Sequence, residues 1–242
     1  KGGEFWERLN LMVVSRWWIA QGQQTEEQVF AGVCSSLLSL SPSDCLTLRN
    51  ISLTSASAVL HGHYCPEGDY SSCWTWTRDD RLGGNQQLQG HLNWLKSQGT
   101  EAFTASISFK KHAVSLFQDM LDQWTPLEPK VNPLSLRHHI SASFRYGVNL
   151  FTVVEAGWRV ILLGYAHDHK LPNADLHSLQ TAIADYDTAW GAYNVMKLDP
   201  YAASLYRGVY FNLPGQTPSP GMDATVDSYR NVSSMLSSTR LL

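Results

Sequence analysis

Residues 134–164, "LSLRHHISASFRYGVNLFTVVEAGWRVILLG", form the strongest helical pattern in the chain and decide its fold. Apolar side chains recur here at every third or fourth position, which is the spacing that lines one face of an α-helix. The face consists of Leu136, Ile140, Phe144, Val148, Phe151, Trp158 and Leu162, with Glu155 as its one charged member. The pattern predicts a long central helix of about eight turns, on which the other elements of an all-α protein are expected to pack.

Shorter helical patterns lie on both sides of this segment, and two of them begin with recognisable caps. Thr25 and Gln28 are placed to form a capping box at the start of one helix. Ser41 can cap the next, with Pro42 at its first position and Asp44 near the positive end of the helix dipole. The patterns predict helices over about 4–20, 25–38, 42–62, 100–124 and 176–200, and a last short helix around 224–236. The predicted inward faces are Trp6, Leu9, Val13, Trp17 and Ala20 on the first helix, Leu48, Ile51 and Val59 on the third, and Phe103, Ile107, Val114, Phe117, Leu121 and Trp124 on the helix over 100–124.

Three segments interrupt the helical patterns. Residues 63–99 predict a loop insertion, residues 125–133 contain three prolines and predict a rigid linker, and residues 208–242 predict an extended, proline-rich C-terminal tail. The chain has no internal repeat and no alternation of strand and helix patterns. We therefore expect a single all-α domain over residues 1–242, with about six amphipathic helices in an irregular bundle.

Composition argues against two classes of protein. The 242 residues carry a net charge of −3 with no run of lysine or arginine, so no nucleic-acid partner is expected. The longest apolar run, "VILLGYA" at 160–166, is shorter than the roughly 20 residues that cross a bilayer. We therefore expect a soluble protein without a membrane span.

Four cysteines and two glycosylation sequons favour an oxidising compartment. The cysteines lie in two close pairs, Cys34 with Cys45 and Cys65 with Cys73. This spacing favours two short disulfide loops, the second within the insertion, although four cysteines allow three connectivities, and it does not fit a zinc site. Asn50 and Asn231 each begin an N-x-S acceptor sequence. We expect a secreted or lumenal glycoprotein.

The insertion holds the first candidate binding site. Its polar and aromatic residues are Trp74, Trp76, Arg78, Asp79, Asp80 and Asn85. Flat aromatic faces beside directional donors and acceptors suit a sugar, which is apolar on its C–H faces and polar at its hydroxyl groups. A disulfide between Cys65 and Cys73 would hold the loop in shape before the ligand binds. The alternative is that the tryptophans fill the helical core and the charges form a local salt bridge.

Glu155 is the second candidate, because a carboxylate on an apolar helix face is costly unless it is paired. It is either a structural ion pair, with Arg145 or Arg159, or a functional acid that opens onto a cleft. Asp185 and Asp187 are expected to be solvated. No metal is expected, because His61 and His63 lack a third ligand at a recognisable interval. The sequence contains no recognised nucleophile or cofactor motif, so the catalytic residues stay unknown.

Several segments together resemble a known architecture. They are "EFWERLNLMVVSRWWIAQGQQTEEQVFAGV", "SLTSASAVLHGHY", "WTRDDRLGG", "FRYGVNLFTVVEAGWRVILLG" and "AIADYDTAWGAYNVMKLDPYAASLYR". In order and character they resemble the helical region after the (β/α)₈ barrel of large glycoside-hydrolase-like proteins of the alpha-glucuronidase or hexosaminidase kind. The resemblance implies a carbohydrate-active protein whose barrel supplies the catalytic carboxylates. A barrel needs roughly 200 residues or more that are absent here, so it lies on another chain or was lost.

Three functions follow as hypotheses. The first is a secreted, helical part or subunit of a glycoside hydrolase with a sugar-facing loop, whose partners are a glycan and a second polypeptide that carries the barrel. The second is a non-catalytic, lectin-like carbohydrate-binding module. The third is a structural subunit that joins a larger glycoprotein assembly through its tryptophan-rich helix faces. No cofactor is expected in any of them.

Overall fold

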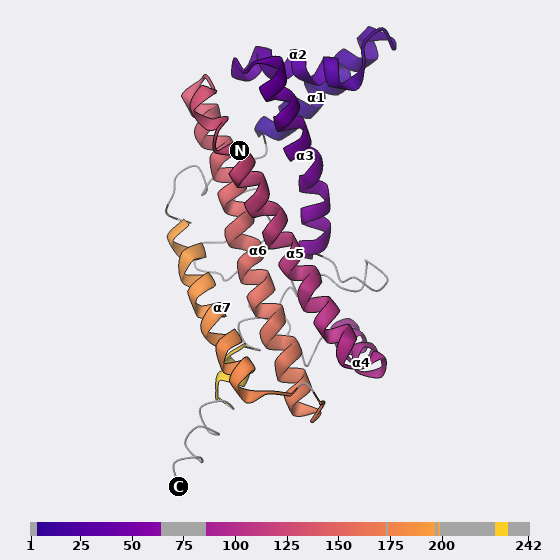
Figure 1. The fold of residues 1–242 in the computed structure, drawn as a ribbon, viewed down its shortest axis with the longest axis vertical. Helices are drawn as coiled ribbons and strands as arrows, with labels where there is room; N and C mark the ends of the chain where they lie inside the picture. The colour runs from indigo at the N-terminus through magenta and orange to yellow at the C-terminus, as the bar shows by residue number, and fades with distance from the viewer. Residues whose placement is uncertain (1–3, 64–85, 173, 197, 199–225, 232–242) are drawn as a thin grey trace. The chain divides into compact units, whose positions relative to one another are not determined.

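A computed structural model describes residues 4–63, 86–172, 174–196, 198 and 226–231 (Figure 1). All regular secondary structure within these ranges is helical, which confirms the all-α prediction. The elements are α1 (Glu4–Ala20), α2 (Glu26–Leu38), α3 (Pro42–His63), α4 (Gln86–Gln98), α5 (Thr100–Trp124), the 3₁₀ helix η2 (Glu128–Lys130), α6 (Leu134–Asp168) and α7 (Leu176–Met196). A further short helix covers residues 226–231.

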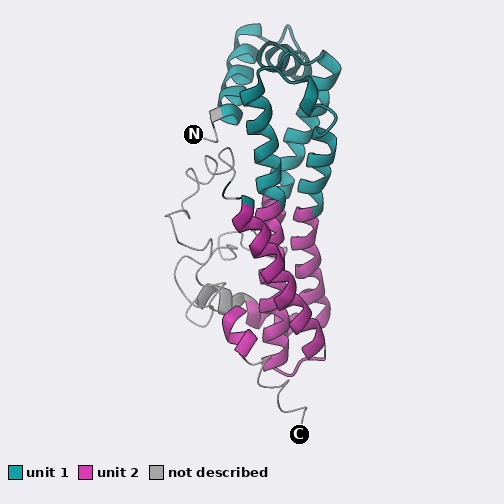
Figure 2. Ribbon diagram, turned by 90° about the vertical axis from the view of Figure 1, so that its left-hand side faces the viewer, with its two compact units in different colours: residues 1–58, 115–148, 196–210 teal, residues 59–114, 149–195, 211–242 magenta. Residues whose placement is uncertain are grey.

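The chain divides into two compact units, which are coloured separately in Figure 2. Unit 1 comprises residues 1–58, 115–148 and 196–210, and unit 2 comprises residues 59–114, 149–195 and 211–242. Helices α3, α5 and α6 each contribute residues to both units. The single domain over residues 1–242 stays a prediction, and each unit is described below by itself.

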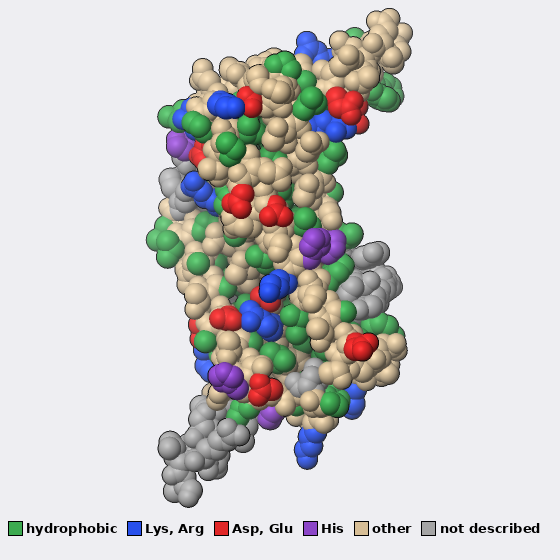
Figure 3. Space-filling model, viewed as in Figure 1, with side chains coloured by type: hydrophobic (Ala, Val, Ile, Leu, Met, Phe, Trp, Pro, Cys, Tyr) green, Lys and Arg blue, Asp and Glu red, His purple; other side chains and the backbone are tan. Residues whose placement is uncertain are grey.

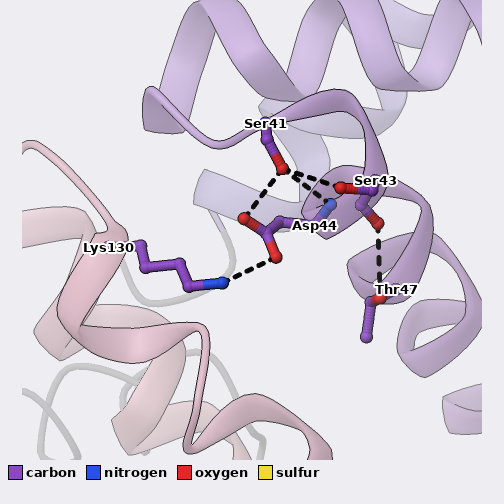
Figure 4. Close-up of polar contacts among 5 residues, drawn as sticks. All are labelled: Ser41, Ser43, Asp44, Thr47 and Lys130. Atoms are coloured by element: carbon purple, nitrogen blue, oxygen red, sulfur yellow. Dashed lines mark hydrogen bonds and ion pairs between the residues drawn. The ribbon is translucent and has the colours of Figure 1, made fainter.

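The predicted caps of α2 and α3 are present in unit 1. The Thr25 hydroxyl accepts from the Gln28 backbone N–H at 3.3 Å, and the Gln28 side chain accepts from the Thr25 N–H at 2.9 Å. Ser41 accepts from the Asp44 N–H at 3.1 Å and donates to the Asp44 carboxylate at 2.8 Å (Figure 4). Asp44 also accepts from Lys130 at 2.9 Å. These hydrogen bonds, that of Lys130 first, hold the pKa of Asp44 below its usual value.

A sharp corner joins α2 to α3 within unit 1. The two helix axes differ by 105°, and Ser39 ends α2 in the left-handed region at φ 59°. The disulfide Cys34–Cys45 links the two helices with both cysteines fully buried, which confirms this predicted pair. A disulfide around such a corner restricts the unfolded chain more than the folded one.

The linker of residues 125–133 is fastened into unit 1 by buried polar contacts. Trp124, fully buried at the end of α5, donates from Nε1 to the Ser141 hydroxyl of α6 at 2.8 Å. Ser141 donates in turn to the Glu128 carboxylate of η2 at 2.7 Å. The Asn132 N–H donates to the Leu38 carbonyl at 3.0 Å. The linker is therefore an ordered connection, as its prolines predict, that contains one 3₁₀ turn.

The core of unit 2 is the second half of α6, which is buried on nearly every side from Leu150 to Ala166. A helix that is apolar all round belongs in a core. Close approaches support this packing: a Cβ at Gly62 would lie 2.0 Å from the Phe151 ring, and one at Gly164 would lie 2.4 Å from the Tyr229 ring. Both glycines therefore bring neighbouring elements against α6 at distances that a larger residue would prevent.

The predicted loop over residues 63–99 is wrong in part, because residues 86–98 form α4. The segment is rich in glutamine and asparagine, which made it resemble a loop, yet Leu92 and Leu95 are buried. Tyr165 of α6 donates to Asn93 of α4 at 2.7 Å, so tertiary packing stabilises a helix of low apolar content. The first part of the insertion, 64–85, lies outside the described residues.

Two predicted helix faces also need correction. On α3, Leu48 and Ile51 are buried as expected, but Val59 is 40% exposed. On α5 the predicted Ile107, Val114 and Leu121 do not lie on the buried stripe, which is shifted by one residue at these positions. It comprises Phe103, Ser106, Lys110, Ala113, Phe117, Met120 and Trp124, with alternate spacings of three and four. Two polar residues therefore lie on a buried face that apolarity alone could not identify.

Candidate functional site

The predicted sugar-binding loop lies outside the described residues. This applies to Trp74, Trp76, Arg78, Asp79, Asp80 and Asn85, and to Cys65 and Cys73. The predicted tail of residues 208–242 is described only over 226–231. Asn50 and Asn231 are both described and exposed, as glycan acceptors require, although Asn50 lies within α3 rather than in a loop. Sugar binding and glycosylation stay predictions.

Glu155 is a structural ion pair rather than a free acid. Its carboxylate accepts from Arg159, one turn later on α6, at 3.0 Å, which selects Arg159 from the two predicted partners. Arg159 also donates to Asp185 of α7 at 2.8 Å. Burial would lower the pKa of Arg159, but the charges and hydrogen bonds of Glu155 and Asp185 outweigh it and raise the pKa. Arg159 therefore pairs with two carboxylates, and the pair with Asp185 joins α6 to α7 in unit 2.

Asp185 and Asp187 were expected to be solvated, and both are exposed, which confirms the prediction. Both are about half exposed, but each forms an ion pair across elements of unit 2. Asp187 accepts two hydrogen bonds from Arg230, at 2.6 and 2.9 Å. These ion pairs stabilise the packing of α7 in unit 2.

Lys110 is a buried cation that the sequence did not single out. Its side chain lies on the buried stripe of α5 and is 2% exposed. The ammonium donates to the Gly62 carbonyl at 2.9 Å and lies 5.5 Å from the centre of the Trp158 ring, within the range of a cation–π contact. Loss of hydration on burial lowers the pKa of Lys110 to about 7.

An amine that is half neutral at pH 7 has the proton affinity of a general base or a nucleophile. The surroundings of Lys110 nevertheless favour packing over catalysis. Its Nζ is occupied by the Gly62 carbonyl and the Trp158 face, and the side chain has almost no access to solvent. Two neighbouring buried groups, Ser106 Oγ and Trp158 Nε1, have no hydrogen-bond partner among the described residues. Lys110, Ser106 and Trp158 therefore place polar groups within the otherwise apolar core of unit 2.

Helix α1 carries the most unusual surface in unit 1. The sequence predicted that Trp6, Leu9, Val13, Trp17 and Ala20 face inward, and Leu9 does so together with Phe5. Trp17 is 49% exposed, which contradicts the prediction at this position. We define the α1 face as its exposed apolar residues: Leu11, Val14, Trp17, Trp18 and Ile19. At the upper right of Figure 3, where α1 ends, hydrophobic side chains lie at the surface beside both kinds of charge.

Next to the α1 face a groove of about 650 Å³ runs between α1 and α2. It is lined by Glu7, Arg8, Leu11, Met12, Ser15, Arg16 and Ile19 of α1, and by Val33 and Ser36 of α2. Its floor is apolar and its rim carries two arginines and one glutamate. The groove and the α1 face are therefore the candidate contact surface of unit 1.

Metal and membrane sites receive no support from the described ranges. No group of three His, Cys, Asp or Glu side chains in them could hold a metal ion. The ring of His61 contacts Phe109 and His112 instead. By length and composition α6 could cross a membrane, and so could α2 and α3 if they formed one bent span. However, 67% of the apolar 18-residue segment of α6 is buried inside the protein. A core helix has the same properties, and the absence of a membrane span stays a prediction.

Comparison of the chain with protein-family models, curated proteins and solved structures finds no match. The resemblance to the helical region of glycoside-hydrolase-like proteins therefore stays a prediction.

Proposed function

We propose that the protein is a non-catalytic structural subunit that joins a larger glycoprotein assembly through the α1 face. The observation that carries this proposal is the exposure of five large apolar residues within nine positions of one helix. Trp18 and Ile19 are 74% and 79% exposed, although the helix packs its other side in unit 1. Since tryptophan is the residue most enriched among the energetic centres of interfaces, this face has the chemistry of a protein contact.

The arrangement of the α1 face supports a contact surface rather than scattered exposure. Leu11, Val14 and Trp18 are three and four residues apart, so they share one side of the helix. Trp17 and Ile19 extend the surface on either side at the same end of α1. A buried aromatic side chain removes about 150–250 Å² from water, and each Å² contributes about 25 cal/mol. Covering Trp18 alone would therefore contribute on the order of several kcal/mol before the costs of association.

The other described polar groups support a non-catalytic role. Glu155 is neutralised by Arg159, and Lys110 is enclosed by protein. General acid–base and nucleophilic catalysis require groups that can reach a substrate. The disulfide Cys34–Cys45 and the exposed sequon residues Asn50 and Asn231 support the proposal that the assembly lies in a secreted or lumenal compartment.

The test is the mass of the native assembly in the cells that produce the protein. Wild type, Leu11→Ser/Trp18→Ser and the control Leu53→Ser, which alters an exposed leucine on α3, are compared by size-exclusion chromatography with light scattering. We expect wild type and control to elute well above the mass of one chain, and the α1 variant to elute as one chain. A wild-type monomer, or an α1 variant with unchanged mass, would contradict the proposal.

A further inference from the structure

We infer that the groove between α1 and α2 binds an amphipathic helix of a partner protein that presents carboxylates toward Arg8 and Arg16. The inference rests on the proposed function, because α1 lines both the groove and the α1 face, and it adds the chemistry of the partner.

The floor of the groove has the character that a helix requires. Leu11, Met12 and Ile19 of α1 supply its accessible apolar surface above the buried Val33 of α2, and Leu11 and Ile19 lie two turns apart. An amphipathic helix that lies in such a groove inserts one apolar side chain per turn, at positions i, i+3 or i+4, and i+7. The volume of about 650 Å³ is also in the range of about 300–1,000 Å³ that is usual for binding sites.

The rim supplies two arginines that are open to a partner. Arg8 and Arg16 are both exposed, and neither forms an ion pair with another described residue. Arginines elsewhere in the chain do: Arg49 pairs with Glu26, Arg159 with Glu155, and Arg230 with Asp187. The two rim arginines are eight residues apart, which is about 12 Å along the helix.

Arg16 extends across the groove toward α2. Its Nη1 atom lies 3.8 Å from the place that a Cβ at Gly32 would occupy, so its charge is held between the two helices. Arg8 lies two turns earlier on α1, next to Glu7 on the rim. Arginine forms bidentate hydrogen bonds with carboxylates. Two Asp or Glu residues, seven or eight positions apart on a partner helix, would therefore meet both arginines.

A lipid surface fits the same residues less well. Helices that lie on membranes carry many Lys or Arg residues on their polar face, whereas α1 carries two Glu and two Arg and has no net charge. The charge balance therefore favours a protein helix, and membrane binding becomes an outcome of the test.

The test uses two helical peptides of about 18 residues, which span about 27 Å, with the same leucine stripe. One carries glutamate at two rim positions eight residues apart and the other carries lysine there. Binding of each labelled peptide to the whole protein is measured by fluorescence anisotropy. We expect the Kd of the glutamate peptide to be about tenfold lower, because it replaces two like-charge contacts of the lysine peptide with two attractive ones. The variant Arg8→Glu/Arg16→Glu should reverse the preference.

A control variant separates local charge from net charge. Lys96→Glu/Lys170→Glu changes the total charge equally at two exposed positions of unit 2, and it should keep the wild-type preference. Equal affinity for the two peptides, or no binding of either, overturns the inference. Binding only to vesicles of phosphatidylcholine and phosphatidylserine overturns it in favour of a membrane. If the peptides fail but the Leu11→Ser/Trp18→Ser variant still loses the assembly, the proposed function stands and only the groove inference falls.

Discussion

The buried amine of Lys110 makes a sharp prediction about stability and pH. In the native protein its pKa is about 7, against 10.5 for an exposed lysine, because burial removes hydration from the ammonium. The unfolded chain therefore keeps a proton between pH 7 and pH 10.5 that the native protein has lost. Where the unfolded chain binds more protons than the native protein, the native protein becomes more stable as pH rises. Lys110 therefore makes the free energy of unfolding increase with pH in this window.

The size of the effect follows from the same two values. A pKa difference of one corresponds to about 1.36 kcal/mol, and the difference between 10.5 and about 7 corresponds to about 5 kcal/mol. The lysine destabilises the protein by about this amount below pH 7, and the penalty disappears as pH approaches 10.5. Lys110→Met keeps the length of the side chain and removes the charge, so its stability should lack this dependence.

The assay is urea unfolding, followed by circular dichroism, at intervals from pH 6 to pH 10. We expect the free energy of unfolding of Lys110→Met to exceed that of wild type by several kcal/mol at pH 6. The gain is reduced by roughly 1–3 kcal/mol, because the variant leaves the Gly62 carbonyl without the hydrogen bond from Lys110. The excess should shrink steadily above pH 7. Lys111→Met, at the adjacent exposed position, is the matched control for the loss of one lysine. A difference between Lys110→Met and wild type that does not change with pH would refute the reasoning.

The remaining predictions concern packing, the disulfide and the insertion. Gly62→Ala should destabilise the protein by about 1–3 kcal/mol in urea unfolding, because its Cβ would overlap the ring of Phe151; an unchanged midpoint would refute this contact. Cys34→Ala/Cys45→Ala should lower the free energy of unfolding by about 3 kcal/mol, as expected for a closed loop with a sequence separation of 11, and a loss below 1 kcal/mol would contradict it. On a glycan array, wild type should bind and Trp76→Ala should not; equal or absent binding by both would remove the sugar-facing loop from the account.

Local patterns predicted the elements whose boundaries depend on nearby residues. The capping box of Thr25 and Gln28, and Ser41 before Asp44, act within one helical turn, so the sequence alone located the starts of α2 and α3. The long pattern of α6 was equally reliable, because its apolar positions persist over many turns. Helix α4 was missed because its stability depends on contacts such as that between Tyr165 and Asn93, which local composition does not contain.

The candidate site was predicted less well, for physical reasons. The sequence identified Glu155 as an acid that needs a partner, but could not choose between two arginines without the geometry of the helix. Lys110 was missed because a lysine in a sequence is taken as exposed, and its burial depends on Gly62 and Trp158, each 48 residues away in the chain. The apolar pattern of α1 predicted a helix, but not that Trp17 would be left at the surface.

The most direct test of the central claim asks whether another chain covers the α1 face. The photoreactive residue p-benzoylphenylalanine is placed at position 18 in place of Trp18, and at the exposed position 53 in place of Leu53 as a control. Both proteins are irradiated in their native assembly and separated under denaturing conditions. The account predicts a cross-linked product larger than one chain from position 18 and none from position 53. No product from position 18, or equal products from both positions, would contradict it.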